Sequence, residues 1–152
     1  MAKFTAEQAT AYVTIQQLIN DWADELDINN GLKMGPHVTE ECHYTVRGVP
    51  RLSRDEVVKF YEGRLAELEA TPAGVWEHRH ILSNLRVDFR GDDHAAIEFK
   101  LVYFMSAMAT PGLEHADPAA VADVWMDVRR DADGHWRISK FHSNQLFRRV
   151  PK

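Results

Sequence analysis

The sequence predicts an α+β fold, in which N-terminal helices pack into a strongly curved, mixed or antiparallel sheet. Three observations lead to this prediction. The first half of the 152-residue chain carries two amphipathic helical patterns. The second half carries four strand-like runs, and short turn sequences separate neighbouring runs. Helices and strands that are kept apart along the chain are typical of α+β proteins. A sheet that curls away from its helices leaves a cavity between the two layers, where a small molecule can bind.

The first helix is expected over residues 5–27. Thr5 and Gln8 stand in the register of a capping box, which satisfies free N–H groups at the start of a helix. Apolar residues then recur at helical spacing and share one face: Tyr12, Ile15, Ile19, Trp22 and Leu26. The sequence "INNG" ends the helix, because asparagine and glycine accept the left-handed conformation of a C-terminal cap. Asp27 therefore lies near the helix end whose dipole slightly disfavours a carboxylate.

The middle of the chain predicts a short segment, one strand and a second helix. Residues 30–41 contain glycines and a proline, and have room for one helical turn at most. Residues 42–48, "CHYTVRG", are typical of a strand that leads into a turn. A second helix is expected over residues 53–70, where Ser53 and Glu56 again stand in capping-box register. The apolar face of this helix consists of Val57, Tyr61, Leu65 and Leu68.

The rest of the chain predicts four long antiparallel strands. The sequences "RGDD" and "DADG" are tight-turn signals within this part, and a longer loop is expected at 109–118. The four strands are expected over residues 76–89, 94–107, 120–131 and 135–147.

Composition and charge limit the class of protein. The chain length suits a single domain over residues 1–152. A net charge of −5 with both signs interspersed gives no indication of a nucleic-acid or anionic-membrane partner. The lone cysteine, Cys42, excludes an intrachain disulfide and cysteine-based metal sites, and it fits a reducing cytoplasm. No signal peptide and no apolar run of transmembrane length is expected, so the predicted localisation is cytoplasmic.

Three motifs together resemble a known superfamily. They are "WADELDINNG" at the end of the first helix, "RHILSNLRVDF" in the first of the four long strands and "VRRDADGHWRISKF" across the last hairpin. Their order and spacing, over residues 8–147, are similar to the nuclear transport factor 2-like superfamily. Within it, the chain resembles the polyketide-cyclase-like (SnoaL-type) and scytalone-dehydratase-like branch. The resemblance implies a cone-shaped α+β barrel.

The resemblance also implies an activity and its residues. Enzymes of that branch pair an aspartate at the end of the first helix with a histidine on the third strand, and the histidine removes a proton from carbon. The matching residues are Asp27 and His80. Tyr44 matches a tyrosine of the dehydratases. The implied protein is a cofactor-independent lyase, dehydratase or isomerase. Its substrate would be a hydrophobic, aromatic or polycyclic molecule that loses water, halide or a small carbonyl fragment.

A histidine–aspartate pair suits this chemistry for a physical reason. The carboxylate fixes the imidazole tautomer and stabilises the imidazolium that forms when a proton is taken. Negative charge on the substrate also needs a partner, for which Tyr44, Tyr103, Lys100 and His142 are candidates. Together with the aromatic residues, the sequence gives six substrate-binding candidates: Trp22, Tyr44, Asn84, Tyr103, Trp125 and His142.

Alternatives remain open for the two histidines of the strand at 76–89. Side chains two residues apart on a strand share a face, so His78 and His80 could both bind a metal ion, with His142 or Asp123 as a third ligand. They could also lie on a solvated sheet face. We interpret His80 as the proton carrier and His78 as its neighbour or a rim residue, with no metal.

The alternation of this strand conflicts with a catalytic His80. If the apolar residues Ile81, Leu85, Val87 and Phe89 face the helices, the set that contains His80 faces away from the cavity. A β-bulge near residues 82–84 would reverse the alternation. Alternatively, the apolar set faces another subunit. In either case a homo-oligomer, a dimer or trimer, is expected.

Two functions other than an enzyme stay possible. The sequence "LSNLRVDF" also resembles the β subunit of aromatic-ring-hydroxylating dioxygenases, which shares the fold and would make this chain a non-catalytic partner of a larger subunit. The same fold could also serve as a small-molecule or protein binding module, since a fold does not determine a function.

Overall fold

The computed structural model describes residues 4–71, 77–106 and 117–148. The loop expected at 109–118 falls mostly outside these residues. The elements in chain order are α1 (Ala6–Asn29), the short helix η1 (Gly35–His37), β1 (Val38–Val46), β2 (Val49–Ser53), α2 (Arg54–Glu69), β3 (Glu77–Phe89), β4 (His94–Ser106), β5 (Ala120–Arg130) and β6 (Trp136–Arg148).

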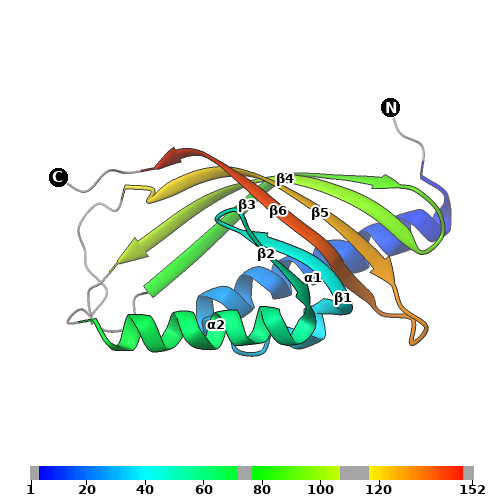
Figure 1. The fold of residues 1–152 in the computed structure, drawn as a ribbon. Helices are drawn as coiled ribbons and strands as arrows, with labels where there is room; N and C mark the ends of the chain where they lie inside the picture. The colour runs from blue at the N-terminus through cyan, green and yellow to red at the C-terminus, as the bar shows by residue number, and fades with distance from the viewer. Residues whose placement is uncertain (1–3, 72–76, 107–116, 149–152) are drawn as a thin grey trace.

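The strands form one curved sheet in the order β2-β1-β6-β5-β4-β3. Strands β1 and β6 pair in parallel, and every other neighbouring pair is antiparallel, so the sheet is mixed. Both helices lie on the same side of the sheet, with α1 running beneath the strands and α2 along the open side (Figure 1). The α+β prediction is confirmed.

Helix α1 begins and ends where the sequence predicts. Thr5 and Gln8 form both hydrogen bonds of the capping box. Asn30 takes the left-handed conformation at the C-terminal cap, with φ of 56°. The predicted apolar face is buried at Ile15 and Trp22. Because the helix ends at this point, Asp27 lies in its last turn, next to the beginning of β3.

Strand β2 is an element that the sequence analysis missed. The chain turns at Arg47 and Gly48, which both have positive φ, at 51° and 78°. A two-residue turn of this kind suits the twist of a hairpin. The next residues, including Pro50, then pair with β1 instead of belonging to the turn. Proline is tolerated there because β2 is an edge strand of the sheet.

A β-bulge divides β3 into two halves. Ser83 pairs with Lys100 and Arg86 pairs with Glu98, so β3 uses one more residue than β4 between these points. Asn84 takes up the extra residue in a left-handed conformation, with φ of 57°. The first of the two explanations for the conflicting alternation, a bulge, is therefore confirmed. Before the bulge the even-numbered residues face the helices, and after it the odd-numbered residues do.

The core lies between the sheet and the two helices. Large side chains from both layers are fully buried in it, among them Trp22, Phe99, Ile15, Met126 and Ile138. Leu85, Val87 and Phe89 from the second half of β3 pack against this core. Within the described part of the chain, no helix combines the length and the apolar character that crossing a membrane would need.

Candidate active site

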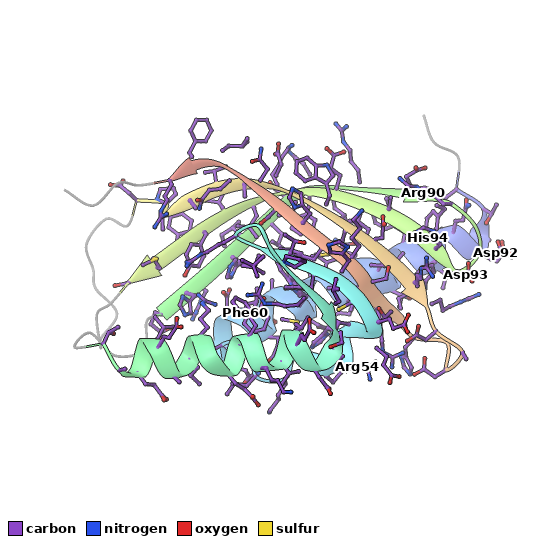
Figure 2. All side chains as sticks on the ribbon, in the orientation of Figure 1. Arg54, Phe60, Arg90, Asp92, Asp93 and His94 are labelled. Carbon is purple, nitrogen blue, oxygen red and sulfur yellow. The ribbon has the colours of Figure 1, made fainter. Side chains whose placement is uncertain are left out.

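A cavity of about 920 Å³ opens between α2, the end of α1 and the concave side of the sheet. This volume is within the usual range for small-molecule sites. Aromatic side chains form much of its wall, with Trp22 from α1, Phe60 from α2 and Phe141 from β6. Figure 2 labels Phe60 on the side of α2 that faces the sheet. Both histidines of β3, His78 and His80, also line the cavity.

Asp27 and His80 are in direct contact. The carboxylate oxygen Oδ1 of Asp27 lies 2.6 Å from His80 Nδ1, and Oδ2 accepts the backbone N–H of His80 at 2.9 Å. Both side chains are shielded, at 13% exposed for His80 and 8% for Asp27. A carboxylate only accepts hydrogen bonds, so Nδ1 carries a proton and the lone pair of a neutral ring lies on Nε2.

The second ring nitrogen of His80 is available to a ligand. Nε2 has no hydrogen-bond partner among the described residues, and it is not fully buried. The His80 ring contacts two aromatic side chains, with its centroid 4.7 Å from that of the Tyr103 ring and 6.2 Å from that of the Trp22 ring. The arrangement therefore presents an oriented base to the interior of an aromatic cavity.

His78 is a neighbour of His80, but it lies neither at a solvated rim nor on a solvated sheet face. Only 2% of its surface is exposed, because the strand alternation that turns His80 inward also turns His78 inward. Its Nδ1 lies 2.8 Å from the Tyr103 hydroxyl, and its Nε2 lies 3.2 Å from Asn30 Oδ1. Burial, together with the charge of Arg64, lowers the pKa of His78 to about 4. His78 is thus a neutral residue that holds Tyr103 in place.

Of the six residues proposed from the sequence to bind substrate, Trp22 and Tyr103 line the cavity. Tyr44 instead lies behind the cavity wall. Tyr44 is fully buried, accepts a hydrogen bond from Trp22 Nε1 at 2.9 Å, and shares one of 2.8 Å with the Tyr61 hydroxyl. Burial raises the pKa of Tyr44 well above its usual value and that of Tyr61 to about 12. Tyr61, and not Tyr44, lines the cavity.

Three other substrate-binding candidates lie outside this cavity. Trp125 is 38% exposed and stacks on His142, which pairs with it across β5 and β6. Both side chains point to the convex face, because residues on alternate sides of these strands fill the core. Asn84 is exposed at the bulge. Lys100, a candidate for charge stabilisation, forms an ion pair of 2.5 Å with Asp123, also away from the cavity.

The hypothesis of a metal site finds no third ligand in the described structure. Of its two candidates, His142 stacks on Trp125 and Asp123 pairs with Lys100. No group of three or more histidine, cysteine, aspartate or glutamate side chains comes close enough to hold a metal ion in residues 4–71, 77–106 and 117–148.

Sequence reasoning missed the contribution of α2 to the site. Phe60 and Arg64 lie on the helix side that lines the cavity, as does Lys59. The apolar pattern of this helix indicated a core face through Val57 and Tyr61, which are buried. A signal was present, since Phe60 and Arg64 are four residues apart and therefore share a helix face next to Tyr61.

The comparison of the chain with family models gives one match, to the SnoaL-like domain, over residues 7–142. The chain belongs to the SnoaL-like domain family. The family predicted from three sequence motifs is thereby confirmed. A search of curated protein sequences gives no match to this SnoaL-like protein.

Several solved structures have the same fold as the SnoaL-like chain. ActVI-ORFA from Streptomyces coelicolor has a TM-score of 0.76 at 12% identity, over 94% of this chain and 99% of that one. A proposed scytalone dehydratase from Novosphingobium aromaticivorans has a TM-score of 0.73 at 16% identity, over 95% and 89%. The hexachlorocyclohexane dehydrochlorinase LinA-type3 from Novosphingobium barchaimii has a TM-score of 0.70 at 15% identity, over 96% and 98%. These likenesses establish the cone-shaped α+β fold of the SnoaL-like chain.

Proposed function

We propose that the protein is a cofactor-independent lyase that eliminates a small group from a hydrophobic, aromatic molecule. One observation carries the proposal. The His80 ring, fixed through Nδ1 by Asp27 at 2.6 Å, presents Nε2 to a cavity with aromatic walls. An oriented imidazole that can take and return a proton is the minimum that an elimination next to an activating carbonyl group requires.

The proposed step follows from the geometry of the pair. Nε2 takes a proton from carbon, the electron pair of the C–H bond becomes a C=C bond, and halide or hydroxide leaves from the adjacent carbon. The imidazolium that forms is stabilised by the Asp27 carboxylate. When hydroxide leaves, the proton on Nε2 can neutralise it, so water departs and the base is regenerated. When halide leaves, the imidazolium gives its proton to solvent water, which regenerates the base.

The structural neighbours are compatible with this class of reaction. One of them is described as a dehydrochlorinase and another as a proposed scytalone dehydratase. An isomerase would use the same base and return the proton to a different carbon. The products distinguish the two reactions, since only an elimination releases halide or water.

The test uses β-chloropropiophenone and β-hydroxypropiophenone, which lose hydrogen chloride or water to give the same conjugated ketone. Its formation is followed by ultraviolet absorbance. The wild-type protein should accelerate both reactions over buffer, and His80→Gln and Asp27→Asn should each lower the rate by roughly 10²- to 10⁴-fold, the usual contribution of a general base.

Matched controls are available in the same chain. His142→Gln changes an exposed histidine outside the cavity, and Asp24→Asn changes an exposed aspartate of α1. Both should keep wild-type rates. Full activity of a folded His80→Gln protein would exclude the proposed base. Co-purification of an inactive wild-type chain with an iron–sulfur subunit would instead favour a role as a dioxygenase β subunit.

A further inference from the structure

Positive charge gathers in the cavity of an otherwise acidic protein. The chain has a net charge of −5, yet three cationic side chains line the cavity: Arg47, Lys59 and Arg64. Among the described lining residues, Glu67 alone carries a carboxylate. These three cations come from the turn after β1 and from α2, and so lie across the cavity from β3. A concentration of one sign of charge in a cleft favours a ligand of the opposite sign.

Arg64 is the least exposed of the three cations. Its side chain is half-buried and forms no ion pair with a carboxylate in the described part of the chain. Holding a guanidinium away from water without a counter-charge is unfavourable. A carboxylate on a bound molecule would supply that counter-charge, and it matches the planar fork of arginine.

The surroundings of Arg64 link it to the proposed base. Its guanidinium approaches the Tyr103 hydroxyl, where it opposes the rise in the pKa of Tyr103 that burial causes. The Tyr103 hydroxyl also contacts His78 Nδ1 at 2.8 Å, and its ring lies 4.7 Å from the His80 ring. His78 Nε2 faces the acceptor Asn30 Oδ1, so Nδ1 accepts a hydrogen bond from Tyr103. The Tyr103 oxygen is then free to face the arginine.

We infer that Arg64 is an anion-binding residue, and that the cavity takes an aromatic carboxylate whose charged group pairs with this guanidinium. The aromatic part then lies against the wall that includes Trp22 and Phe60, beside His80. The inference rests on the proposed function in naming the substrate of the same site. It assigns the recognition of charge to α2 and the removal of a proton to β3.

The test compares two probes of the same shape, β-naphthoate and the neutral β-naphthamide, by isothermal titration calorimetry at pH 7. The carboxylate should bind the wild-type protein about tenfold more tightly than the amide. This factor corresponds to the lower end of the free energy that a hydrogen bond to a charged group usually contributes. The preference should disappear in Arg64→Gln, while the amide still binds with the wild-type affinity. Arg64→Lys should keep part of the preference.

Controls separate this inference from the proposed reaction. Arg90→Gln changes an exposed arginine of the β3–β4 turn, which Figure 2 shows at the far end of the sheet, and it should keep the full preference. His80→Gln should keep it too, because binding at Arg64 does not need the base. Equal affinity of the wild type for both probes, no binding of either at millimolar concentration, or an unchanged preference in Arg64→Gln would overturn the inference. A carboxylate preference without any elimination activity would contradict the proposed reaction alone.

Discussion

The first half of β3, residues 77–83, turns its even-numbered side chains toward the helices, where His78 and His80 line the cavity. The second half, residues 85–89, turns its odd-numbered side chains to the core. The first half carries two inward histidines with specific partners, and the second carries inward leucine, valine and phenylalanine. One additional residue, Asn84, separates the two. A single backbone irregularity thus lets one strand serve both a polar site and an apolar core.

The largest effect is expected from removing this irregularity. Deletion of Asn84 would give both halves the same alternation, so either His80 leaves the cavity or Leu85, Val87 and Phe89 leave the core. Exposing the three apolar side chains costs on the order of 4 kcal/mol, a large part of the stability of a domain of this size. Urea denaturation followed by circular dichroism should show a large loss of stability or an unfolded protein. A deletion variant with wild-type stability would contradict the role assigned to the bulge.

The buried histidine of the first half should make stability depend on pH. Burial lowers the pKa of His78 to about 4 in the folded protein, from its usual value of 6.5. The unfolded chain therefore binds the additional proton between these values, and the free energy of unfolding falls as pH drops from about 6.5 to 4. The loss attributable to His78 is about 3 kcal/mol at most.

The variant His78→Gln tests this assignment. It should be less stable than the wild type at pH 7, since Asn30 and Tyr103 lose their partner, but its stability should fall less steeply between pH 6.5 and 4. Urea denaturation at several pH values gives both quantities. An equally steep fall in the variant would mean that other groups cause the acid destabilisation.

A smaller effect is expected on the opposite side of the first half, where the bulge turns Ile81 outward, 53% exposed. Ile81, Val102, Val121 and Phe147 are cross-strand neighbours and form an apolar row over β3, β4, β5 and β6. We expect this row to contribute to the predicted dimer or trimer, because exposed apolar patches mark interaction sites.

Light scattering after size-exclusion chromatography tests the oligomer. The variant Ile81→Asp should weaken self-association by roughly tenfold or more, since a buried unpaired carboxylate is unfavourable, and should keep the monomer folded. Ser83→Asp, on the same side of β3 but outside the apolar row, is the matched control. A wild-type protein that is monomeric at high concentration would contradict the prediction.

The smallest effect concerns the bulge residue itself. Asn84→Gly should change the free energy of unfolding by less than about 1 kcal/mol, because glycine adopts a positive φ without steric cost. Asn84→Val should cost about 1–2 kcal/mol more, since a β-branched residue is strained in this conformation. Thermal denaturation compares the two variants, and equal stability of both would indicate that the bulge moves elsewhere in β3.

Local sequence patterns determined most of the elements. The capping box at Thr5 and Gln8, the apolar face of α1, and the four long strands each depend on residues close together in the chain, and the structure bears them out. The motifs also indicated the family and the pair Asp27 and His80, whose contact is present although its catalytic role stays a prediction. Strand β2 escaped detection because its proline and short length are typical of a turn.

What only the tertiary structure decided is which way side chains face. Alternation along a strand is fixed locally, but the place where a bulge reverses it depends on the register in which β3 pairs with β4 across their hairpin. That pairing buried His78 and turned His80 inward, while the pairing of β5 with β6 left Trp125 and His142 on the convex face. It also took the packing of α2 against the sheet to bring Arg64 to the same cavity as His80. The sequence by itself determined the elements and the chemistry available to them, whereas the face that each side chain presents was set by the register of strand pairing and by helix packing.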